Sequence, residues 1–65
     1  MNDLLPPAST IDVPLKDQID EVAREIIMRQ RVYGHQVAIK KMTQAEADRR
    51  ILRMQAVLAT LQRLK

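Results

Sequence analysis

The sequence predicts an all-α protein, an antiparallel two-helix hairpin that self-associates. Two long stretches carry apolar side chains at helical spacing, one on each side of residues 40–43. The residues between the two stretches include the side chains that typically begin a helix. No stretch shows the apolar-polar alternation of a strand.

The connection between the helices is predicted at residues 40–43, with the second helix running over about 44–64. Thr43 and Glu46 have the spacing of a capping box. In that motif the hydroxyl accepts from the amide of the third helical residue, and the carboxylate bonds back to the amide of the cap. Met42 and Ala47 occupy the flanking apolar positions of a hydrophobic staple.

The first helix is predicted over about 14–39, with Pro14 as its first residue because the fixed φ of proline suits that position. Gly34 interrupts the run, and glycine inside a helix costs about 1 kcal/mol relative to alanine. We therefore expect a continuous helix that is weakened or kinked there. The predicted inner seam of this helix consists of Leu15, Ile19, Val22, Ile26, Arg29, Tyr33 and Val37.

The second helix repeats apolar residues in steps of four and three, which predicts a clean seam along one face. Its members are Ala47, Ile51, Met54, Leu58 and Leu61. Residues 1–13 show neither the helical spacing of apolar residues nor the alternation of a strand. They contain the pair Pro6-Pro7, which favours extended backbone. This arm is interpreted as a flexible tail, with docking onto a partner as the alternative.

A 65-residue chain without cysteine has little core with which to stabilise itself, so we expect help from self-association. Each helix carries a second apolar or small-residue stripe that a hairpin leaves uncovered. A homodimer forming a four-helix bundle, or a larger oligomer, would cover both stripes. The predicted interface consists of Met28, Val32, Ile39, Leu52, Ala56 and Ala59.

The residue types argue against catalysis. The chain has no cysteine, His35 is its only histidine and Gly34 its only glycine, so it offers no nucleophile–base pair, no metal cluster and no phosphate loop. We expect a non-enzyme without cofactor or metal. No basic segment leads into an apolar one at the N-terminus, and no stretch is apolar enough to span a bilayer. A cytoplasmic protein without membrane contact is therefore expected.

Three segments resemble a group of small proteins encoded by tailed bacteriophages and prophages, usually among early or accessory genes. The resemblance covers about residues 20–62. It is carried by Arg24-Glu25-Ile26-Ile27-Met28-Arg29-Gln30-Arg31-Val32-Tyr33, by Lys41-Met42-Thr43-Gln44-Ala45-Glu46-Ala47-Asp48-Arg49 and by Met54-Gln55-Ala56-Val57-Leu58-Ala59-Thr60-Leu61. Where that group often has proline after the tyrosine, this chain has Gly34, and where it often has glycine this chain has Lys40. The resemblance implies a phage accessory protein, a class rich in counter-defence and host-takeover factors.

Arg29 occupies a seam position where an aliphatic residue is expected, and the seam of the second helix offers it no acid. Its guanidinium requires a partner, because a buried unpaired charge is costly. One interpretation is a binding pocket for a phosphate or nucleotide, formed by Arg29, Tyr33, Lys40 and Arg50, since arginine suits phosphate and tyrosine stacks on bases. The alternative is that Arg29 extends to solvent and pairs with Glu25.

Charge is divided unevenly along the chain. Residues 1–23 carry one lysine against five acids, a net charge of −4, whereas residues 24–65 carry ten cationic side chains against three acids, a net charge of +7. Lys41, Arg49 and Arg53 form a basic patch near the turn that would suit an anionic partner.

Three functions remain open at this point. The first is sequestration of a small anionic signal, such as a nucleotide, at an oligomer cleft. The second is inhibition of a host protein through an exposed apolar helix face. The third is nucleic-acid binding as an accessory dimer, which the single aromatic residue makes less favourable.

Overall fold

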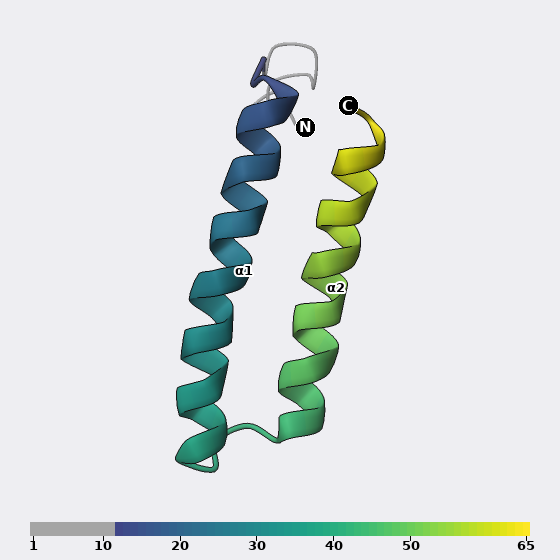
Figure 1. The fold of residues 1–65 in the computed structure, drawn as a ribbon. Helices are drawn as coiled ribbons and strands as arrows, with labels where there is room; N and C mark the ends of the chain where they lie inside the picture. The colour runs from purple at the N-terminus through teal and green to yellow at the C-terminus, as the bar shows by residue number, and fades with distance from the viewer. Residues whose placement is uncertain (1–11) are drawn as a thin grey trace, which may run out of the picture.

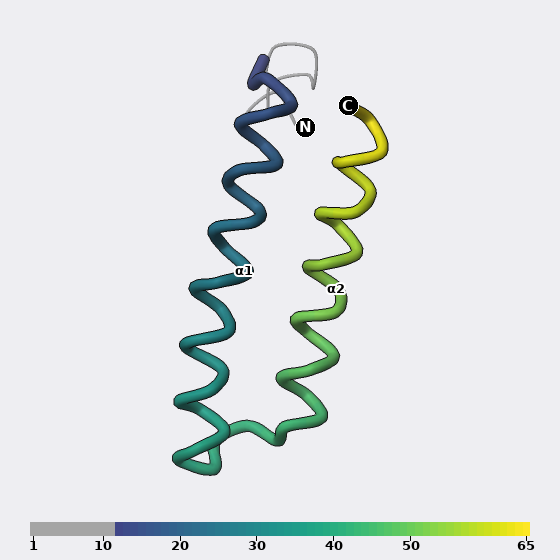
Figure 2. Tube along the Cα trace, viewed as in Figure 1, coloured from purple at the N-terminus to yellow at the C-terminus, as the bar shows by residue number. Residues whose placement is uncertain are grey.

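The computed structural model describes residues 12–65, which form two helices and the turn that joins them. Helix α1 spans Leu15–Ala38 and helix α2 spans Gln44–Arg63. The helices run antiparallel beside each other, so the C-terminus lies at the same end as the start of α1 (Figure 1; Figure 2). The predicted all-α hairpin is confirmed, and residues 1–11 of the predicted arm lie outside the described residues.

Helix α1 begins one residue later than predicted, because Pro14 is its N-cap rather than its first helical residue. The backbone of Pro14 is extended at ψ 143°, while its carbonyl already accepts from the amide of Gln18 at 3.2 Å. The side-chain amide of Gln18 also donates to the carbonyl of Val13 at 2.8 Å. Helix α1 then continues without interruption through Gly34, as expected.

Helix α1 ends at a Schellman motif that the sequence analysis did not identify. The amide of Lys41 donates to the carbonyl of Gln36 at 2.8 Å, and the amide of Lys40 donates to the carbonyl of Val37 at 3.0 Å. These are the two bonds that define the motif, and the residue after the cap adopts the left-handed conformation in it. Here that residue is Lys40, with φ 61°. The chain therefore reverses direction within a few residues of Ala38.

Thr43 is the N-cap of helix α2, as the capping pattern predicts. The Thr43 hydroxyl accepts from the amide of Glu46 at 3.1 Å. The second predicted bond of the capping box, from the Thr43 amide to the Glu46 carboxylate, is not among the hydrogen bonds of residues 12–65. That carboxylate instead accepts from Arg50, one turn further along, at 3.1 Å. A charged guanidinium is a stronger donor than a backbone amide, which explains the exchange.

Both predicted seams face the interior of the hairpin, where every seam residue is buried or half-buried. The apolar core of residues 12–65 is nevertheless small: Ile19, Ile26 and Ala47 alone are buried. Several large apolar side chains on the outer faces are exposed instead. They are Val13, Ile27, Met28, Val32, Ile39, Leu52, Val57 and Leu64.

Candidate anion-binding site

A hollow of about 330 Å³ lies on one side of the helix pair, and three arginines line it. Its lining residues, which we call the arginine hollow, are Arg29 and Tyr33 from α1 with Arg50, Arg53 and Met54 from α2. Arg29, Tyr33 and Met54 are seam positions, so helix packing places them between the helices. Arg50 and Arg53 flank that seam, one turn apart. No carboxylate-bearing residue is among the five that line the hollow.

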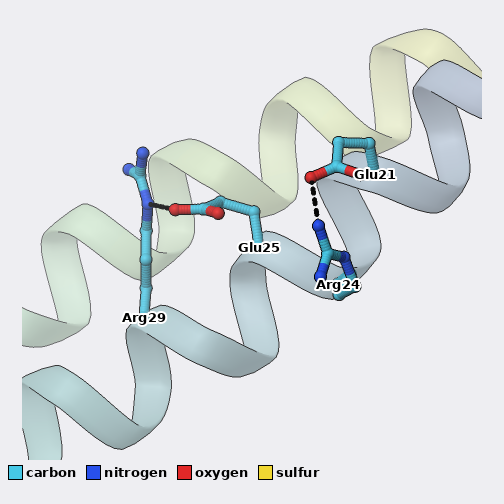
Figure 3. Close-up of polar contacts among 4 residues, drawn as sticks. All are labelled: Glu21, Arg24, Glu25 and Arg29. Carbon is cyan, nitrogen blue, oxygen red and sulfur yellow. Dashed lines mark hydrogen bonds and ion pairs between the residues drawn. The ribbon is translucent and has the colours of Figure 1, made fainter.

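Arg29 is paired within its own helix. Its Nε donates to Oε1 of Glu25 at 2.9 Å, and the Arg29 side chain keeps 40% of its surface exposed. Figure 3 shows these two side chains turned toward each other on α1, with the pair Glu21 and Arg24 next along the helix. The sequence-based alternative, pairing with Glu25, is the arrangement found. The contact engages Nε, and the Arg29 guanidinium also interacts with the hydroxyl of Tyr33.

Arg50 has a similar neighbour on α2, where its Nη2 donates to Oε2 of Glu46 at 3.1 Å. The hydroxyl of Tyr33 also lies close to it. The Tyr33 hydroxyl, followed by the Glu46 carboxylate, raises the pKa of Arg50 above its ordinary value. The hydrogen bond to Glu25 raises the pKa of Arg29 in the same direction, with Tyr33 contributing. Arginine is protonated throughout the physiological pH range at its ordinary pKa, and these contacts act in the same direction.

The local charge remains positive. Glu25 and Glu46 each offset one arginine of the hollow, and no ion pair of Arg53 is recorded within residues 12–65. Three cationic side chains thus stand against two carboxylates, and both carboxylates lie outside the lining. An anion entering the hollow would meet guanidinium donors from both helices.

Lys40, the fourth predicted ligand-binding residue, is not among the residues that line the arginine hollow. Lys40 lies two turns beyond Tyr33, a distance of about 10 Å along the helix axis. Its left-handed backbone places it in the turn. There it borders a separate hollow of about 460 Å³, which is lined by Val37, Lys40, Lys41, Met42, Thr43, Gln44 and Glu46.

The predicted basic patch is divided by the structure. Lys41 borders the hollow at the turn, Arg53 lines the arginine hollow, and Arg49 is exposed and lines neither. Arg53 was predicted in the basic patch and not in the ligand pocket. The signal was available, because Arg53 follows Arg50 by three residues and therefore shares its flank of α2.

A third hollow, also of about 460 Å³, lies between the helices. Gln30 and Gly34 border it on α1, whereas Arg29 borders the arginine hollow, and Tyr33 lines both. We call it the glycine groove. Its lining residues are Gln30, Tyr33, Gly34, Val37, Gln44, Ala47, Asp48, Ile51, Leu52 and Gln55, so Asp48 is the single acid among them.

The predicted interface residues are all exposed in this structure. Leu52 lines the glycine groove with 64% of its surface exposed. Val32, 55% exposed, does not line it.

Within residues 12–65, no helix combines the length and apolar character required to cross a membrane. No group of three or more acidic or histidine side chains in this part of the chain is placed to share a metal ion. Comparison of the chain with protein-family models, with curated proteins and with solved structures finds no match.

Proposed function

We propose that this protein is a non-catalytic, phage-type accessory protein that captures a small phosphate-bearing ligand of the nucleotide class. The observation that carries the proposal is the arginine hollow, in which Arg29, Arg50 and Arg53 from two helices surround one space beside Tyr33. Capture without turnover suits a counter-defence role, in which a signal molecule is removed from solution by binding.

The chemistry of the lining favours phosphate over a simple carboxylate. Each guanidinium presents a planar fork of donors that matches two phosphate oxygens. The contact with Glu25 engages Nε of Arg29, so its Nη groups, with the Tyr33 hydroxyl beside them, are the donors that would meet a ligand. Arg53 adds a third cationic side chain, so the hollow best suits a ligand whose phosphate oxygens can contact more than one guanidinium group.

Tyr33 supplies the second half of the recognition. It is half-buried between the helices and lines the hollow beside Arg29 and Arg50. An aromatic ring in this position offers a flat apolar face to a nucleobase. The volume of about 330 Å³ lies at the lower end of the range for small-molecule pockets. A mononucleotide or one half of a cyclic dinucleotide is of suitable size.

Self-association belongs to the proposal, because the hairpin buries so few apolar side chains. An oligomer would carry one arginine hollow per copy. Several hollows on one particle would hold a multivalent nucleotide through more than one contact.

The test is isothermal titration calorimetry of the full chain with inorganic phosphate, mononucleotides and cyclic dinucleotides. We expect heat with at least one nucleotide, and a loss of at least tenfold in affinity for Arg29→Ala and for Arg50→Ala. Arg29→Lys retains the charge but loses the fork, so its affinity is expected to fall between wild type and Arg29→Ala.

The matched control is Arg49→Ala, which removes one exposed arginine outside the hollow. Its affinity is expected to equal that of wild type. Absence of heat with every ligand would refute nucleotide capture. An equal loss for Arg49→Ala and Arg29→Ala, together with a steep salt dependence, would indicate general anion or nucleic-acid binding instead.

A further inference from the structure

The glycine groove combines an exposed glycine with exposed apolar side chains near it. Around the position that a Cβ of Gly34 would take, no side chain and no backbone outside its own helical turn lies within 4 Å, so the surface of α1 is open there. Leu52 lines the same groove and is 64% exposed. Ile27 precedes Gly34 by seven residues, which places both on one face of α1, and it is 54% exposed.

We infer that the glycine groove is the docking site for a second copy of this chain, packed antiparallel about a two-fold axis. In that arrangement Ile27 of each copy fills the space above Gly34 of the other. The axis then passes near Gln30 and Arg31, midway between these two positions. This inference rests on the self-association proposed above and specifies the face and orientation that it uses.

Charge complementarity favours a second copy in the antiparallel orientation. Residues 12–23 carry one lysine against four acids, a net charge of −3, and Arg63 and Lys65 of the C-terminal segment at the same end bring the sum to −1. Residues 40–53 at the turn end carry five cationic side chains against two acids, a net charge of +3. An antiparallel pair places the acidic start of α1 beside the basic turn of its partner. A parallel pair would bring two basic turns together.

The rest of the groove is compatible with such packing. Apart from Asp48 its lining residues are uncharged, so the groove itself contributes no arginine or lysine to the interface. Arg31 of each copy lies near the axis and is exposed, so its guanidinium can stay in solvent at the edge of the pair. The small side chains of Gly34 and Ala47 allow close approach of a facing helix. In addition, Arg29, Arg50 and Arg53 lie outside this groove, so pairing here leaves the arginine side chains of each copy open to solvent.

Sedimentation velocity of wild type and three variants tests whether the glycine groove is the face that pairs. Wild type is expected to be dimeric at tens of micromolar. Gly34→Leu fills the open space at Gly34 that the partner would occupy, and leucine has a higher helix propensity than glycine. Leu52→Asp places a charge in the groove. Both are expected to raise the dimer dissociation constant at least tenfold. Val32→Asp is the matched control, since Val32 is 55% exposed but outside the groove, and it is expected to stay dimeric.

The outcomes are distinguishable. A wild type that remains monomeric at 100 µM would overturn both this inference and the self-association on which it rests. The wild type could instead form an oligomer that Val32→Asp dissociates and that Gly34→Leu and Leu52→Asp leave intact. That result would overturn the glycine groove as the docking face and would leave self-association standing. Far-UV circular dichroism of Gly34→Leu confirms that the variant is helical, so loss of the dimer is not mistaken for loss of folding.

Orientation is tested by crosslinking, which the absence of native cysteine makes clean. Asp20→Cys and Lys41→Cys chains are mixed and treated with a short bis-maleimide. An antiparallel pair is expected to link Cys at position 20 of one copy to Cys at position 41 of the other. Links only between identical positions would show a parallel pair and overturn the orientation, as would the absence of any link.

Discussion

At the scale of the residue, Lys40 is the position most at odds with its local backbone. Its φ of 61° lies in the left-handed region, where a Cβ approaches the carbonyl oxygen and costs roughly 1–2 kcal/mol. The position is the residue after the cap in a Schellman motif, which glycine fills most readily. The side chain of Lys40 does not line the arginine hollow, so the residue can be changed without altering the candidate site.

We expect Lys40→Gly to raise the free energy of unfolding by about 1 kcal/mol, because glycine removes the Cβ penalty at this φ and part of the gain is lost to backbone entropy of the unfolded chain. Urea denaturation followed by circular dichroism measures this change. Lys40→Ala is the control, since it removes the charge and retains the Cβ, and it should not stabilise. A Lys40→Gly chain no more stable than Lys40→Ala would contradict the strain assigned here.

At the scale of the element, each helix end uses a different device. Thr43 caps α2 through its hydroxyl, whereas α1 has no side-chain cap at Pro14. The carbonyl of each N-cap residue accepts the first helical hydrogen bond in the same way. The capping pattern at residues 43–46 therefore predicted the start of α2 correctly, and its second bond was lost to Arg50. That loss has a consequence for the candidate site, because Glu46 holds Arg50 beside the hollow.

Removing the cap should weaken the whole hairpin. Thr43→Ala leaves the amide of Glu46 without its hydroxyl partner, so the free energy of unfolding is expected to fall by about 1 kcal/mol. Thermal unfolding followed at 222 nm reports the loss as a lower Tm. Thr43→Ser, which retains the hydroxyl, is expected to stay close to wild type, and a Tm equal to that of Thr43→Ala would show that the hydroxyl is not the stabilising group.

At the scale of the whole molecule, stability depends on very few buried side chains. Domains typically have about 0.05–0.15 kcal/mol of stability per residue, which gives roughly 3–10 kcal/mol for a chain of 65 residues. Ile26, Ile19 and Ala47 are the buried apolar residues of the part that the structure describes. A single truncation in this core therefore removes a large share of the total.

We expect Ile26→Ala to lower the free energy of unfolding by about 2–5 kcal/mol, through lost burial and the cavity left behind. Met28→Ala is the control, because Met28 is 48% exposed and two positions away on the same helix. Chemical denaturation of both chains at equal concentration checks the difference. Comparable losses in the two variants would mean that the hairpin seam is not the stabilising core.

By itself, the sequence determined the helical periods, the seam of each helix and the cap at Thr43, because these depend on spacing and on contacts within a few residues. The tertiary structure decided which side chains share a space. Local spacing placed Lys40 on the side of Tyr33, yet Lys40 lies in the left-handed turn and does not line the arginine hollow, whereas helix pairing brings Arg53 to it. These features depend on how two helices lie against each other, and that relation is fixed by packing across the hairpin rather than by spacing along either helix.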